Sequence, residues 1–281
     1  MLQRISNSWE LFQASARVLS KDKELLLFPV ISFIALIVVS AIFFIPMAIG
    51  GILDSLFSED FGFFSLVPLF LFYIVQYFVI FFSNTALVGA ALIRLRGGDP
   101  TLRDGFRIAA SHFGPILGYA LIAATVGIIL KAASERNRGL TRFVVNLIGM
   151  AWNIGTYLVV PILAVEDVGP IDAIKRSVEL LKKTWGEQIA GNFGLGAISA
   201  IVSIGLVGIG GAFTIFAISA QLDIWVIVIV LVILVFALML LALVNSTLTG
   251  IYTAAVYQYA ADGQLESYFE PDLIQSAFTS R

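Results

Sequence analysis

Three asparagines lie inside long apolar runs of the sequence, where an amide side chain has few polar neighbours. They are Asn84, Asn153 and Asn245, and the same runs also hold Gln76 and Thr249. In hydrocarbon such a group either hydrogen-bonds to a neighbouring helix or lines a polar path for a solute. We therefore predict an intramembrane polar cluster of these five residues. Interhelical bonding is the commoner role of such groups, and a pore or substrate pocket is the alternative.

Small residues recur at helical spacing between residues 196 and 212. Gly196, Ala200, Gly208 and Ala212 form two pairs, each with three residues between its members. In a membrane, small side chains at this spacing allow another helix to approach closely. The pattern predicts a helix-packing face within the chain, and an interface between copies of the chain is the alternative.

The residue types that carry most enzyme chemistry are scarce. The chain has no cysteine and one histidine, His112. A lone histidine without neighbouring acids is a poor metal site and an unsupported general base. The sequence also contains no phosphate-binding Walker A loop, no H-E-x-x-H and no G-x-S-x-G. We expect no catalytic, cofactor-binding or metal-binding residues, and hence no enzyme.

The elements that position these residues follow from the composition. Of 281 residues, 59% are apolar and 13% are charged, whereas a soluble domain has roughly 45–50% and about 25%. So few charges exclude a soluble globule and a disordered chain. A net charge of −2 gives no overall attraction to nucleic acid. The partners we expect are membrane lipids, a partner protein or a second copy of the chain, and not nucleic acid.

The charges fall outside six uncharged stretches, each longer than the roughly 20 residues that cross a bilayer as a helix. Because the apolar runs are continuous, helices are favoured over the alternating strands of a barrel. We predict an all-α polytopic membrane protein with six transmembrane helices in a single domain, residues 1–281. The stretches are 25–53, 61–93, 108–130, 143–165, 188–222 and 224–261.

Lysine and arginine predict the orientation of these spans, because they collect on the cytoplasmic side of a membrane. With six crossings, 13 of the 17 basic residues lie on the side that holds both termini. Both termini are therefore expected to be cytoplasmic. The other side holds Lys131, Arg136, Arg138 and Arg142, which leaves open whether the third and fourth spans cross fully.

The chain also shows a threefold pattern, in which a short amphipathic helix precedes two spans. The pseudo-repeats cover about residues 1–97, 98–168 and 169–263, and an acidic tail follows at 262–281. Each helix keeps its apolar residues on one face and is expected to lie in the membrane interface. The residues on these faces include Ile5, Trp9, Phe12, Leu102, Phe106, Ala109, Ile174, Val178 and Leu181. Residues 84–89 (Asn-Thr-Ala-Leu-Val-Gly) and 245–250 (Asn-Ser-Thr-Leu-Thr-Gly) echo one another.

Residues 173–186, Ala-Ile-Lys-Arg-Ser-Val-Glu-Leu-Leu-Lys-Lys-Thr-Trp-Gly, precede a glycine-rich span. This segment resembles the hallmark of an uncharacterised prokaryotic family of six-span membrane proteins. That family is distantly similar to the membrane domain of glycerophosphodiester phosphodiesterases. The resemblance implies a multi-pass protein of a prokaryotic plasma membrane and supplies no functional residues. The phosphodiesterase activity is not expected here, because the chain has one histidine and no acidic metal cluster.

Two functions of different class follow from these patterns. The first is a non-catalytic membrane protein that organises or accompanies lipids or a partner protein. The alternative is a transporter or channel for an uncharged or lipid-like solute along a path lined by the asparagines. Ion coupling is disfavoured, because no acidic or basic side chain lies within a span.

Overall fold

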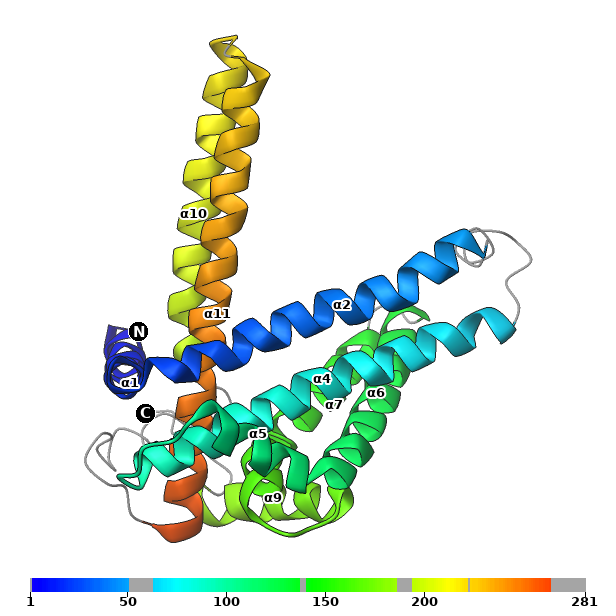
Figure 1. The fold of residues 1–281 in the computed structure, drawn as a ribbon, viewed down its shortest axis with the longest axis vertical. Coiled ribbons are helices and arrows are strands. Elements are labelled where there is room, and N and C mark those ends of the chain that lie inside the picture. The colour runs from blue at the N-terminus through cyan, green and yellow to red at the C-terminus, as the bar shows by residue number, and fades with distance from the viewer. Residues whose placement is uncertain (1, 51–62, 137–139, 186–193, 222, 264–281) are drawn as a thin grey trace.

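The computed structural model describes residues 2–50, 63–136, 140–185, 194–221 and 223–263 (Figure 1). Throughout these ranges the regular structure is helical, and no strand occurs in them. The helices are α1 (Leu2–Lys21), the 3-10 helix η1 (Lys23–Leu26), α2 (Leu27–Ile49), α4 (Phe63–Leu95), α5 (Leu102–Ser111), α6 (Phe113–Arg136), α7 (Leu140–Gly155), α8 (Val159–Val165), α9 (Pro170–Trp185), α10 (Gly194–Ser219) and α11 (Ile224–Asp262). The predicted acidic tail lies outside the described residues beyond Gly263.

Six helical segments among the described residues are long and apolar enough to cross a membrane. This finding confirms the predicted all-helical membrane class. The segments are Lys23–Ile49, Val67–Leu95, Phe113–Glu135, Arg142–Val165, Val202–Ser219 and Ile224–Asp262. Each of them overlaps one of the uncharged stretches, because the cost of burying a charge in hydrocarbon keeps charged residues out of such helices.

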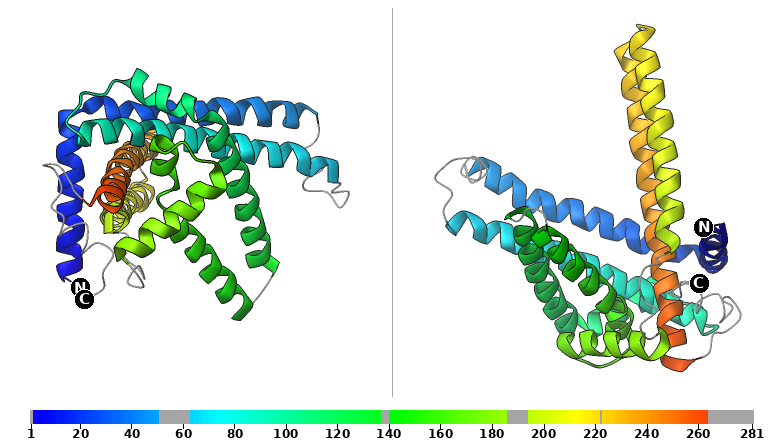
Figure 2. Two further views of the ribbon diagram at one scale, coloured as in Figure 1. Left: turned by 90° about the horizontal axis from the view of Figure 1, so that it is seen from below. Right: turned by 180° about the vertical axis from the view of Figure 1, so that it is seen from behind.

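The spans form three hairpins: α2 with α4, α6 with α7 and α8, and α10 with α11. Helices α4 and α6 pack together, so the first two hairpins share one body (Figure 1). The α10–α11 hairpin rises steeply away from it. In the view from below, this hairpin is seen nearly end-on, while α2 and α4 run across the picture (Figure 2). The six spans therefore share length and composition but not one common direction.

The buried core lies at the C-terminal ends of the second, fourth and sixth spans, which we call their inner ends. We call this region the base: residues 83–95 of α4 and 247–262 of α11, together with α1, α5, α8 and α9. Core side chains include Leu87 and Leu95 of α4, Ile162 of α8 and Tyr257 of α11. By contrast, the outer parts of α2, α10 and α11 expose rows of large apolar side chains. The buried core therefore lies next to the parts of the spans that expose apolar side chains, and it is separate from those parts.

One glycine shows how closely the base packs. An added Cβ at Gly105 of α5 would lie 2.5 Å from the ring of Phe28 and 2.6 Å from the carbonyl oxygen of Ala86. No side chain fits at that distance. Glycine at this position lets α5 lie directly across the α2–α4 hairpin.

The fourth span differs from a single continuous helix. Helix α7 ends at Gly155 and α8 begins at Val159. Pro161 explains the interruption, because its ring lacks an N–H and would clash with the carbonyl of Tyr157 in a continuous helix. The freed backbone N–H of Leu158 donates instead to the Ser177 hydroxyl, at 3.1 Å in a buried position. The segment that interrupts the span is thus held by α9.

Candidate functional site

A charged hollow of about 350 Å³ lies where α1, η1 and the turn from α4 to α5 meet. It collects ionisable side chains from parts of the sequence that are far apart. Its lining consists of Ser20, Lys21, Asp22, Lys23, Glu24, Arg94, Asp99, Pro100 and Thr101. The hollow lies where two candidate spans begin or end, at Lys23 and at Leu95.

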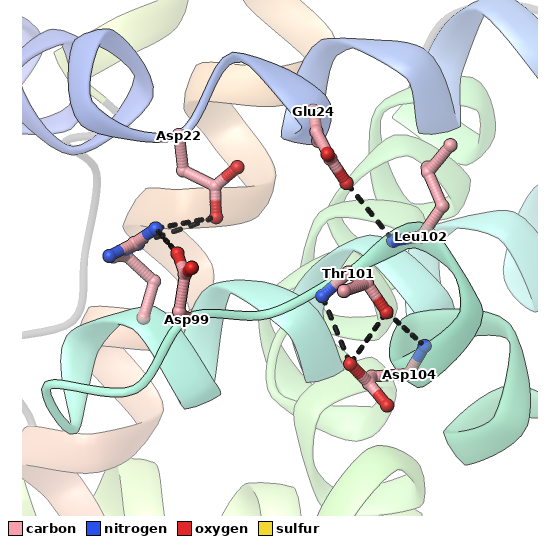
Figure 3. Close-up of polar contacts among 7 residues, drawn as sticks. Asp22, Glu24, Asp99, Thr101, Leu102 and Asp104 are labelled. Carbon is pink, nitrogen blue, oxygen red and sulfur yellow. Dashed lines mark hydrogen bonds and ion pairs between the residues drawn. The ribbon is translucent and has the colours of Figure 1, made fainter.

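Arg94, in the last turn of α4, carries the central charge of this hollow. Its Nε and Nη2 atoms each lie 3.3 Å from Oδ2 of Asp22, and Nη2 also pairs with Oδ1 of Asp99 (Figure 3). The Asp22 side chain is only 4% exposed and that of Arg94 is 17% exposed, while Asp99 is 91% exposed. Charge-assisted bonds of this kind are the strong ones in a protein. Arg94 therefore joins the end of α1 to the α4–α5 turn.

The start of α5 closes the other side of the hollow through a capping box. The Thr101 hydroxyl accepts a bond from the Asp104 N–H at 3.3 Å, and the Asp104 carboxylate accepts from the Thr101 N–H at 3.0 Å (Figure 3). The bonds from the Thr101 hydroxyl and N–H lower the pKa of Asp104. Glu24 of η1 accepts a longer bond, of 3.4 Å, from the Leu102 N–H. The start of α5 is thereby joined to η1.

A second polar cluster joins the inner ends of α8, α9 and α11. Tyr257 donates to Oε1 of Glu166 at 3.0 Å, and Nε of Arg176 lies 3.5 Å from the same oxygen. Partial burial lowers the pKa of Arg176, but bonds to Glu179 and the charge of Glu166 outweigh this effect and raise it. Glu166 is thus shared between a phenol and a guanidinium, and it fixes the turn that precedes α9.

Hydroxyl groups gather where the fourth span is interrupted. The Thr253 hydroxyl donates to the hydroxyl of Tyr157 at 3.4 Å, and Tyr252 lies within electrostatic range of Tyr157. Tyr252 is 3% exposed, and its hydroxyl has no hydrogen-bond partner among the described residues. Irregular backbone at membrane depth is tolerated where it is buried in protein or lines a cavity. Here it is accompanied by polar groups that the core has not fully satisfied.

The five residues of the predicted polar cluster lie on helices α4, α7 and α11. Gln76 donates to the Ser40 hydroxyl at 2.9 Å, which joins α4 to α2. Asn84 and Asn245 are half-buried in α4 and α11, whereas Asn153 and Thr249 are exposed. The Gln76 contact is the interhelical bonding expected of such groups. The convergence of the three amides stays a prediction.

The predicted helix-packing face lies on α10. Ala200, Gly208 and Ala212 are exposed, and an added Cβ at Gly208 would meet no atom within 4 Å. It is Gly210 that packs on α11, because an added Cβ there would lie 2.6 Å from Leu234. The surroundings of Gly196 lie outside the description. The predicted packing face and its alternative, an interface between copies of the chain, both stay predictions.

His112 directly follows α5 and caps its C-terminal end. Its Nδ1 donates to the Ile108 carbonyl at 3.0 Å. In the part of the chain that the structure describes, no three histidine, aspartate or glutamate side chains gather as a metal site.

The hollow and the unsatisfied tyrosine were not predicted from the sequence. The available signals were a charge at each boundary of an apolar run, such as Asp22 and Arg94, and Pro161 within the fourth run. None of these signals predicts which residues pair, because Asp22 and Arg94 are 72 positions apart in the sequence.

Comparison with known proteins assigns the chain to a family. Residues 63–267, well over half of the sequence, match a family of unknown function, DUF6159. The chain belongs to this family. The match covers α4 to α11, including Arg94, Asp99 and the interrupted fourth span. No curated protein and no solved structure matches the chain. Membership of DUF6159 confirms the expected uncharacterised family and lends no support to the relation with phosphodiesterase membrane domains.

Proposed function

We infer that this protein is a non-catalytic integral membrane protein that organises or accompanies lipids, alone or beside a partner protein. One observation carries this proposal. In the most apolar part of α11, no side chain is buried within the chain, and α2 and α10 expose similar rows. Only lipid or another apolar surface can solvate such rows.

Lipid retention and solute flux together test this proposal. The full chain is purified in mild detergent, its bound lipids are counted by native mass spectrometry, and a second sample is reconstituted in vesicles. We expect retained lipids and no permeation of glycerol or transfer of a fluorescent phosphatidylcholine between leaflets. A chain that retains no lipid would contradict the proposal.

The transporter is the second candidate, and the interrupted fourth span favours it. Broken helices with unsatisfied polar groups form substrate sites in several transporter folds. Here the buried Tyr252 hydroxyl is such a group. Movement of glycerol or of the fluorescent lipid that is lost in Tyr252→Phe or Asn153→Leu would establish this function instead. The variant Thr125→Val, at an exposed position of α6 outside the predicted polar cluster, is the control.

The proposal includes a threefold repeat, with α1, α5 and α9 in the membrane interface. Two features support it. On α5, Gly105 and Ala109 are buried while Arg103 and Arg107 are exposed. In two of the proposed repeats, a glycine near the end of the second span also packs against the short helix that follows that span. An added Cβ would lie 3.0 Å from Ile108 at Gly89, and 3.3 Å from Val178 at Gly155. The distant likeness to phosphodiesterase membrane domains stays a prediction.

The proposed address is the plasma membrane of a prokaryote, with both termini cytoplasmic. The absence of native cysteine makes this orientation testable with single thiols. Ile49→Cys, at the outer end of α2, should react with an impermeant maleimide from outside intact cells. Lys182→Cys on α9 should react only after the membrane is opened. The reverse pattern would overturn the orientation.

A further inference from the structure

We propose that the charged hollow around Arg94 binds the headgroup of a zwitterionic phospholipid that carries a primary ammonium, as in phosphatidylethanolamine. The inference rests on the proposed lipid-organising function and names the lipid class and the site.

The position of the hollow fits a headgroup. Two candidate spans, Lys23–Ile49 and Val67–Leu95, have their inner ends at its edge. Phospholipid headgroups lie immediately outside the hydrocarbon that such spans cross. The hollow is therefore placed at the depth where phosphate and amine groups are concentrated.

The charges of the hollow balance. Lys21, Lys23 and Arg94 face three carboxylates, those of Asp22, Glu24 and Asp99. Arg94 is held between Asp22 and Asp99, and Lys21, Lys23 and Glu24 line the rest of the hollow. A phosphate is attracted by the lysines and an ammonium by the carboxylates. An anionic headgroup without an amine would leave the carboxylates opposed by a like charge.

Size and surroundings fit the same ligand. A hollow of about 350 Å³ is within the roughly 300–1,000 Å³ of small-molecule sites. Leu27, Ile31 and Ile34 of α2 follow one another at intervals of four and three residues, and all three are exposed. A helix places residues at these intervals on one face. This apolar row leads away from the hollow along α2, where an acyl chain would lie.

Competition between lipids tests the site. The purified full chain is offered equal amounts of phosphatidylethanolamine, phosphatidylcholine and phosphatidylglycerol, and bound lipid is counted by native mass spectrometry. We expect phosphatidylethanolamine to be favoured by about fivefold, the upper range for one exposed ion pair. Phosphatidylcholine should follow, because its quaternary amine donates no hydrogen bond to the carboxylates.

Two charge reversals make the result specific. Lys23→Glu makes the lining acidic and should abolish the preference. Glu24→Lys makes it basic and should shift the preference to phosphatidylglycerol. The control is Lys183→Glu, which changes the net charge equally at an exposed position of α9 outside the hollow. Thermal unfolding checks that each variant is folded. If Glu24→Lys does not fold, the lipid preference of Lys23→Glu alone decides the test.

Three results would overturn the inference: a wild-type preference for phosphatidylglycerol, an unchanged preference in Lys23→Glu, or an equal loss in Lys183→Glu. Lipids retained without headgroup preference would refute this site and leave the proposed function standing. A wild-type chain that retains no lipid at all would refute both.

Discussion

Asp22 is a charged residue in the core of a protein that otherwise keeps its charges at its edges. Its carboxylate is almost fully buried, and Arg94 is the cation beside it. A buried ion pair contributes little net stability, yet removal of one member leaves the other charge without compensation. The pair therefore fixes the chain between α1 and η1 against the last turn of α4.

Arg94→Ala should lower the free energy of unfolding by about 3 kcal/mol, because it leaves Asp22 buried without its cation. Thermal unfolding of the detergent-solubilised chain, followed by circular dichroism, measures the loss. Lys175→Ala, which removes an exposed pair with Asp172, should cost less than about 1 kcal/mol. Equal effects of the two substitutions would show that Asp22 is not buried with Arg94.

The capping box of α5 gives a pH dependence. Hydrogen bonds lower the pKa of Asp104 below its ordinary value of 3.8, so the ionised form stabilises the folded chain. This contribution is complete above the ordinary value and is lost as the pH falls through the lowered value. The difference in melting temperature between the wild type and Asp104→Asn should therefore shrink on acidification from about pH 6 to about pH 3. A difference that is constant over this range would contradict the assignment.

The sequence predicts where such charged residues lie, but it does not predict their partners. The boundary charges could be located, since hydrocarbon excludes them from the runs between. Their pairing could not, because a partner 72 positions away is chosen by how the helices pack. The same limit applies to the polar residues of the spans. Gln76 was expected to bond to a neighbouring helix, but nothing in the local pattern selects Ser40.

At the scale of elements, the sequence predicted the spans well and the fourth span incompletely. Uncharged length is a direct consequence of the bilayer, so each apolar run corresponds to a helix in the structure. The interruption of the fourth span depends on one residue, Pro161, and on a hydroxyl from α9 that satisfies the freed N–H. A proline in the sequence predicts the break. The hydroxyl of Ser177, which accepts the bond from the freed N–H of Leu158, is brought there only by the fold.

Close packing of α5 can be tested with a matched pair of glycines. Gly105→Ala should destabilise the chain by about 1–3 kcal/mol, because the new methyl group overlaps Phe28 and the Ala86 carbonyl. Gly114→Ala makes the same change near the start of α6, where no atom lies within 4 Å of the new carbon. That substitution should be neutral or should stabilise by up to about 1 kcal/mol. Denaturant unfolding compares them, and a neutral Gly105→Ala would contradict the described contact.

For the whole molecule, the notable feature is that the α10–α11 hairpin projects away from the α2–α4 hairpin (Figures 1 and 2). A flat bilayer holds spans that tilt by up to about 40° from its normal. Hairpins that cross steeply fit such a bilayer only if both tilt strongly and in opposite directions, whereas membrane spans tilt by about 20° on average. We therefore expect the two hairpins to swing toward one another in a membrane.

Spin labels at the hairpin tips measure this rearrangement. In a background without native cysteine, Ile49→Cys marks the tip of α2 and Ser219→Cys the tip of α10. In nanodiscs, electron spin resonance should report a tip separation shorter than that in the structure. A pair within one hairpin, Ile49→Cys with Val67→Cys, should keep its separation and serves as the control. An unchanged separation between the two tips would contradict the expectation.

Helix α11 belongs to both regions, since it runs without interruption from Ile224 to Asp262. At 1.5 Å per residue this rod is about 58 Å long, nearly twice the thickness of a hydrocarbon layer. Its outer half exposes apolar side chains, and its inner half places Tyr257 beside Glu166. Because a continuous helix is stiff, a change of tilt at one end moves the other end as well. We expect a thicker or thinner bilayer that changes the tilt of the outer half to shift the inner half as well, and so to strain the bond between Tyr257 and Glu166.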